Sequence, residues 1–238
     1  MSKSLTLTAV LCFVAWLTAT IGTAGQTQQA TAAQPRFDEL VRADFFAGVG
    51  GNVAALDRAM RFIEQTLAKD PGRADVLVWH GAGLVTRASH AFEKGDAATG
   101  AALWQQGLGE MNEAVAREPE NVAVLIPRGA VLLEVSRSLP DAQEAKSLLT
   151  TGVGDYEKVL ALQAPYFRYL SEHSRGELLF GLAEGLHRLG ERARARIYFE
   201  RLLSEATGSE YGRMADAWLK NPNESTTRRN GCVGCHKK

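Results

Sequence analysis

The sequence has few of the features that mark the common classes of enzyme and nucleic-acid-binding protein. It holds only three cysteines in 238 residues, and its 27 Lys and Arg are balanced by 27 Asp and Glu. A nucleic-acid-binding protein usually shows a basic excess or stripe, so we expect no nucleic-acid partner. No Ser-His-Asp constellation, phosphate-binding loop or paired-carboxylate motif stands out, which disfavours hydrolase and kinase chemistry.

Strand-forming segments are also scarce. Aromatic residues make up 8% of the chain, and few runs are rich in the β-branched and aromatic residues that strands favour. Ala, Leu, Glu, Arg and Gln dominate instead, and these residues favour helices. The apolar content of 45% is ordinary for a globular protein, and the chain is long enough to bury a core. The composition predicts an all-α fold.

A long apolar run opens the chain. Lys3 precedes an apolar stretch from Leu5 to about Leu17, and a group of small residues follows. This order predicts a secretory signal peptide over residues 1–24, cleaved after Ala24. The alternative is an uncleaved anchor helix, because the stretch from Leu5 to Ile21 nearly spans a bilayer. With cleavage, the mature protein would be periplasmic or secreted, without a membrane span, and would keep two cysteines.

After a polar linker over residues 25–35, one spacing recurs four times. A small residue is followed four positions later by a large apolar residue. The pairs are Ala59–Ile63, Gly107–Met111, Gly152–Tyr156 and Ala195–Phe199. Residues at i and i+4 share one helix face, so such a pair lets a neighbouring helix approach closely. The first members, at positions 59, 107, 152 and 195, are 48, 45 and 43 residues apart, which predicts an internal repeat.

The last copy resembles the tetratricopeptide repeat (TPR) family. The residues at that family's signature spacings are Leu179, Leu182, Ala183, Leu186, Gly190, Ala195 and Phe199. The units here are longer by about 10 residues, and the signature tryptophan and tyrosine are mostly replaced. The resemblance implies a TPR-like solenoid of about four helical hairpins over residues 36–207. A capping helix near Glu210–Leu219 would close a domain that spans 36–220.

The resemblance also implies a surface that binds another protein or a peptide. The alternative is that the repeats form only a rigid scaffold. The chain offers no observation that separates the two, and it leaves open whether the protein forms a homo-oligomer.

The C-terminal tail, residues 221–238, is polar at first and ends in a motif that carries chemistry. Cys232 and Cys235 are two residues apart, and His236 follows directly. This is the attachment signature of c-type haem, in which two thiols bond the haem vinyl groups and the histidine ligates the iron. The tail thus resembles the monohaem c-type cytochromes, which implies one covalent haem c. The tether before the motif, about 11 residues, could reach about 35 Å when extended.

Three other interpretations of the two cysteines stay open. They could form a thioredoxin-type redox pair, although no α/β pattern surrounds them. They could bind zinc, although a structural site needs four ligands and the mature chain has no further cysteine. They could also form a short disulfide without a redox role.

The sixth haem ligand would have to come from upstream, from another molecule, or be absent. His80, beside Trp79, and His90, beside Phe92, share one predicted helix and are the first candidates. The weaker candidates are His173, His187, Met60, Met111 and Met214. We expect Met111 in the core, His173 at a helix start, and His187 facing outward in the repeat register.

The sequence therefore predicts an extracytoplasmic electron carrier rather than an enzyme. A TPR-like array would dock a protein redox partner, and the haem would exchange electrons with it. The alternative is a periplasmic adaptor or assembly scaffold in which the haem is secondary or absent. A haem sensor or peroxidase would need an open coordination site and a distal acid–base residue that the sequence does not reveal.

Overall fold

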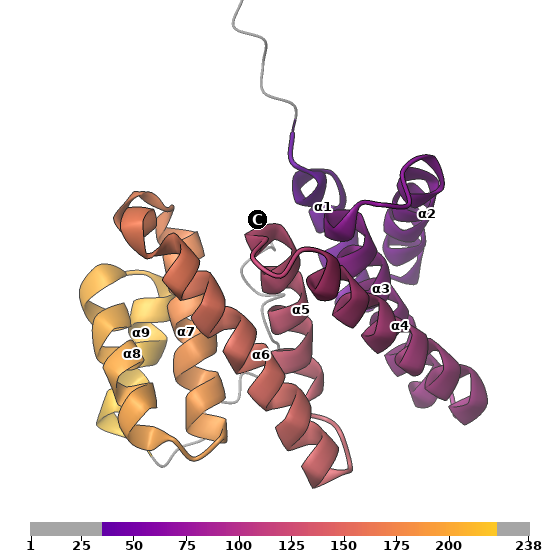
Figure 1. Cartoon of the computed structure of the whole chain (residues 1–238). Helices are drawn as coiled ribbons and strands as arrows, with labels where there is room; N and C mark the ends of the chain where they lie inside the picture. The colour runs from indigo at the N-terminus through magenta and orange to yellow at the C-terminus, as the bar shows by residue number, and fades with distance from the viewer. Residues whose placement is uncertain (1–34, 223–238) are drawn as a thin grey trace, which may run out of the picture. The chain divides into compact units, whose positions relative to one another are not determined.

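The computed structural model describes residues 35–222, and all regular structure in that range is helical (Figure 1). The helices are α1 (Phe37–Val49), α2 (Val53–Lys69), α3 (Ala74–Glu93), α4 (Ala97–Arg117), α5 (Val122–Val135), α6 (Ala142–Gln163), the 3₁₀ helix η1 (Ala164–Tyr169), α7 (Glu172–Arg188), α8 (Arg192–Glu205) and α9 (Glu210–Lys220). The all-α prediction is confirmed for this range. The predicted signal peptide and the haem-binding motif lie outside the described residues.

Helices that are neighbours along the chain pack in pairs: α1 with α2, α3 with α4, α5 with α6, and α7 with α8. In Figure 1 the two helices of the α5/α6 pair run side by side and are joined by a short turn. Helix α9 packs against α8 and α7. This is the predicted array of four helical hairpins, and α9 is the capping helix expected near Glu210–Leu219.

The recurring small–large pairs lie on the second helix of each hairpin, and both members of every pair are buried. The α3/α4 hairpin shows why the small residue is needed. A Cβ atom on Gly107 would lie 2.6 Å from the carbonyl oxygen of Gly81 and 2.9 Å from Cγ2 of Val85. The two backbones approach more closely than an alanine would allow, which is the packing that the spacing predicted.

Replacing Gly107 by alanine is expected to lower the free energy of unfolding by about 1–3 kcal/mol, because the added methyl group would meet the backbone of α3. Gly109, on the same helix, is the matched control. A Cβ there would meet nothing within 4 Å, and alanine should stabilise the helix by about 0.5–1 kcal/mol. Urea unfolding followed by circular dichroism measures both. A Gly107→Ala chain as stable as the Gly109→Ala chain would contradict the close contact.

Three hairpin turns share one construction, a glycine with positive φ followed by the residue that precedes the next helix. The φ angles are 96° at Gly51, 79° at Gly95 and 84° at Gly190. Glycine adopts this region readily, whereas other residues are strained there. Asn52 and Asp96 then accept a hydrogen bond from a backbone N–H in the first turn of the following helix.

The α5/α6 hairpin turns at Leu139-Pro140 without a glycine. The Oδ1 atom of Asp141 accepts a hydrogen bond of 2.7 Å from the backbone N–H of Glu144, which is the N-cap contact of a capping box. Pro127 lies inside α5, beyond its first turn. It therefore removes one backbone donor from the helix interior.

The buried apolar side chains form two clusters, and α5 contributes to both. Helices α1 to α4 form the first cluster together with Val124 and Leu132 of α5. Helices α6 to α9 form the second cluster together with Leu125 and Leu133 of α5 and Phe167 of η1. Helix α5 is thus buried on two faces. No helix within residues 35–222 has the length and apolar character needed to cross a membrane.

Two buried carboxylates join neighbouring helices around α5. Asp155 of α6 is 5% exposed, and its oxygens accept hydrogen bonds from Nε and Nη2 of Arg128 on α5, at 2.8 Å and 2.6 Å. Arg128 also donates from Nη1 to Asn112 of α4, at 3.0 Å. Glu184 of α7 is 2% exposed and accepts a hydrogen bond of 2.7 Å from Nη1 of Arg137. Each pair satisfies charges that would be costly if one partner were lost.

Candidate functional site

The predicted haem-binding residues lie beyond Pro222, the last residue that the structure describes. The attachment of haem through Cys232 and Cys235, and ligation by His236, therefore stay predictions. The described chain does place the histidines and methionines that the sequence offered as sixth ligands. Their surroundings decide how well each could serve.

His80 lies on α3 between two glutamates. Its Nδ1 is 2.5 Å from Oε2 of Glu110 on α4, and its Nε2 is 4.0 Å from Oε1 of Glu64 on α2. A carboxylate that accepts from one ring nitrogen commonly orients the other nitrogen toward a metal. Here Glu64 lies on the side of that second nitrogen. The ring therefore links α2, α3 and α4, and it could ligate iron only after Glu64 turned away.

His90 lies half-buried in the last turn of α3, as the sequence predicted for a residue sharing a helix with His80. Ten residues separate the two histidines, which is about 15 Å along the helix axis. Phe92, beside His90, is 46% exposed, and its ring lies against Gly100 at the start of α4. The two candidate ligands are thus too far apart to serve a single iron together.

The weaker candidates are mostly structural. Met60 and Met111 are fully buried in the first cluster, so the prediction of a core role for Met111 is confirmed. His173 lies in the first turn of α7, as expected, with its Nε2 3.6 Å from Oε2 of Glu177. Met214 of α9 is half-buried and packs on the second cluster. Within residues 35–222 no three His, Cys, Asp or Glu side chains gather as a metal site.

The prediction that His187 faces outward is wrong. Its ring packs edge-on against Trp218 of α9, with ring centroids 5.3 Å apart, and its Nδ1 is buried without a described partner. In the repeat register this position faces outward unless another helix packs on that side of α7. Here α9 packs there and covers the ring of His187. Burial lowers the pKa of His187, and Arg192 acts in the same direction, whereas Glu184 opposes it.

The lowered pKa of His187 predicts that acid weakens the packing of α9. Because the unfolded chain takes up the proton at the ordinary histidine pKa of about 6.5, the free energy of unfolding should fall as pH drops below that value. His187→Gln should remove this part of the pH dependence. Thermal unfolding between about pH 8 and pH 5.5 measures the slopes, and a His187→Gln chain with the wild-type slope would contradict the assignment.

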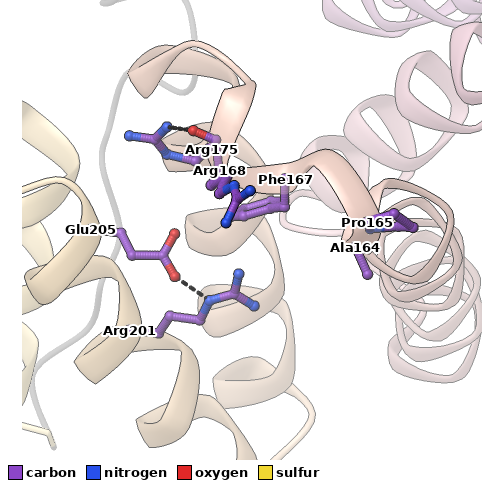
Figure 2. Close-up of a pocket in the computed structure, with 7 residues that line it drawn as sticks. All are labelled: Ala164, Pro165, Phe167, Arg168, Arg175, Arg201 and Glu205. Carbon is purple, nitrogen blue, oxygen red and sulfur yellow. Dashed lines mark hydrogen bonds and ion pairs between the residues drawn. The ribbon is translucent and has the colours of Figure 1, made fainter.

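A cleft of about 560 Å³ lies where the end of α6 and η1 meet the start of α7 and the end of α8 (Figure 2). Its lining combines apolar with charged side chains: Ala164, Pro165, Phe167, Arg168, Arg175, Arg201 and Glu205. Three arginines and one glutamate give this lining a formal charge of +2. Positive charge beside an apolar wall suits an anionic group attached to an apolar body.

Arg175 is held from one side of its guanidinium. Its Nη1 donates to the carbonyl oxygens of Arg168 and Leu170, at 3.0 Å and 2.8 Å, and Figure 2 draws the first of these bonds. Its Nε is buried and has no partner among the described residues. A buried donor without a partner is rare in folded proteins and calls for a specific explanation.

The other two arginines of the cleft are engaged by neighbours. Arg201 donates from Nε to Oε1 of Glu205 at 2.5 Å, and its guanidinium lies 4.5 Å from the ring centroid of Phe167. Arg168 stacks over the ring of Tyr169 at 4.6 Å. Cation–π contacts of this kind keep the charge while fixing its position.

This cleft was not predicted from the sequence. One signal was present, because the stretch "APYFRYLSEHSR" over residues 164–175 gathers three aromatic residues and two arginines. Arg201 and Glu205 join them only because α8 packs on α7. No protein-family model, curated protein or solved structure matches the chain, so the TPR and cytochrome resemblances stay predictions.

Proposed function

We propose that the protein is an exported c-type haem protein in which a helical-hairpin array docks a redox partner and the tail carries the electron-transferring haem. The observation that carries this proposal is the Cys232–Cys235–His236 motif, together with the apolar N-terminal run typical of export. The donor set fits haem c, since it offers two thiols at the attachment spacing and an adjacent imidazole. The bound haem would supply reversible one-electron chemistry.

The residues of the chain would divide that work. Cys232 and Cys235 would anchor the haem, and His236 would ligate the iron from one face. The helical array would carry the docking surface, and the polar segment after α9 would set how far the haem reaches. Two described features support a separate docking body: the last described helix ends at Lys220, and the described helices pack around two apolar clusters.

The test is a spectrum of the protein exported in the presence of c-type haem maturation machinery. A pyridine haemochrome assay after removal of loose haem should show one covalent haem per chain, with the band position of two thioether bonds. The purified protein should then accept an electron from dithionite and return it to ferricyanide. A haem-free protein under these conditions would overturn the proposal and favour the adaptor or scaffold.

A further inference from the structure

Arg175 places a fixed positive charge in the lining of the cleft. Its Nη1 donates to two carbonyl oxygens, which holds the guanidinium in one orientation. The charge of this guanidinium favours a carboxylate in the cleft. The arginine is thus fixed in position before any ligand arrives.

The surrounding groups favour the same chemistry. Arg168 and Arg201 add positive charge to the lining, and Glu205, its one acid, is already bonded to Arg201. Pro165 and Phe167 give an apolar wall next to the charges. A ligand that is wholly polar would leave this wall unused, and a wholly apolar one would leave the arginine charges without a counter-charge.

We infer that this cleft binds the carboxylate of an organic acid with a flat or compact apolar body, and that Arg175 is its anchor. The acid could be a free small molecule, or it could be a propionate of the haem on the chain's own tail. The polar tether before Cys232 extends to about 35 Å, and this length sets which parts of the array a propionate could meet. The tail source rests on the proposed function, whereas the free-acid source does not.

The first arm of the test uses the haem-free full-length mature chain and titration calorimetry with benzoate. Benzoate should bind at one site, and its neutral isostere benzamide should bind about tenfold more weakly or worse. Arg175→Gln should weaken benzoate binding by about tenfold, because it removes the fixed positive charge. The control is Arg196→Gln, which removes an exposed arginine paired with Glu200 on α8 and should leave binding unchanged.

Arg175 also holds the end of η1 through its two hydrogen bonds to carbonyl oxygens. The binding result for Arg175→Gln is therefore used only if its circular dichroism spectrum matches that of the wild type. Arg168→Gln is the second variant, because the hydrogen bond of that side chain goes to Tyr169 of the same 3₁₀ helix. It should weaken benzoate binding by about two- to fivefold, with an effect that shrinks as salt is added. Undetectable benzoate binding, equal binding of benzamide, or wild-type binding by both folded variants would each overturn the inference.

The second arm repeats the titration on haem-loaded protein and measures the haem potential. If a propionate occupies the cleft, benzoate binding should fall by about tenfold on loading, and Arg175→Gln should shift the potential while haem content stays the same. If the acid is a free molecule, loading should change neither quantity. Either result supports a carboxylate site. Should the chain carry no haem at all, the proposed function fails and the first arm still decides the inference.

Discussion

A chain in which Cys232 and Cys235 are both replaced by alanine is expected to carry no covalent haem, whereas the wild-type chain should carry one. Each thiol would form one of the two thioether bonds to the porphyrin, so no covalent link would remain without them. The measurement is the haem left on the chain after extraction with acidified solvent. We expect the folded array to be unaffected, since its helices lie within residues 37–220 and its core residues are all upstream.

Single replacements sharpen the result. Either cysteine alone should hold haem through one thioether bond. The haemochrome band should then lie between the band of haem with two thioether bonds and the band of haem with none. Cys12→Ala is the matched control, because this third cysteine lies in the predicted signal peptide and should not alter haem content. Haem that survives extraction from the double variant would show that these thiols are not the attachment points.

Asp155→Ala is expected to destabilise the protein by about 3–5 kcal/mol. The change leaves the guanidinium of Arg128, only 12% exposed, without its bidentate carboxylate between α5 and α6. A buried charge that loses its partner is far more costly than the pair itself is stabilising. This loss would be a large part of the roughly 5–15 kcal/mol typical of a whole folded domain. Guanidinium unfolding monitored by circular dichroism measures it.

The cost of Asp155→Ala should come from the unpaired charge and not from the lost side chain. Replacing both partners, in an Arg128→Met, Asp155→Leu chain, should therefore recover most of the stability. Glu200→Ala breaks an exposed pair on α8 and should change stability by about 0.5 kcal/mol or less. An Asp155→Ala chain no less stable than the Glu200→Ala chain would refute a buried role for this carboxylate.

The fold was predictable because its packing repeats a local pattern. A pair such as Gly107 and Met111 predicts that a second helix packs closely on that face, and both residues are indeed buried against α3. The turns depend on single residues as well, since Gly51 and Gly95 take positive φ angles just before the residues that cap α2 and α4. Helix α9 was predictable from its position after the last repeat, where an array of hairpins needs a cap.

The surroundings of single side chains were not predictable to the same degree. The ring of His187 is covered because Trp218, which is 31 positions further along the chain, packs on it. A local sequence pattern does not predict a contact over that separation. The two glutamates around His80 come from separate helices, α2 and α4. The cleft likewise needs Arg175 of α7 and Arg201 of α8 to meet, which is a property of the packing and not of either segment.

The most direct test of the account is the intact mass of the mature protein, purified from the exported fraction of cells that make c-type haem. The account predicts one species, with the mass of residues 25–238 plus one haem. That single number would establish cleavage after Ala24 and covalent loading of the tail together. A mass equal to residues 25–238 alone, in cells that load a known c-type cytochrome, would contradict the haem function and leave the helical array as a binding scaffold.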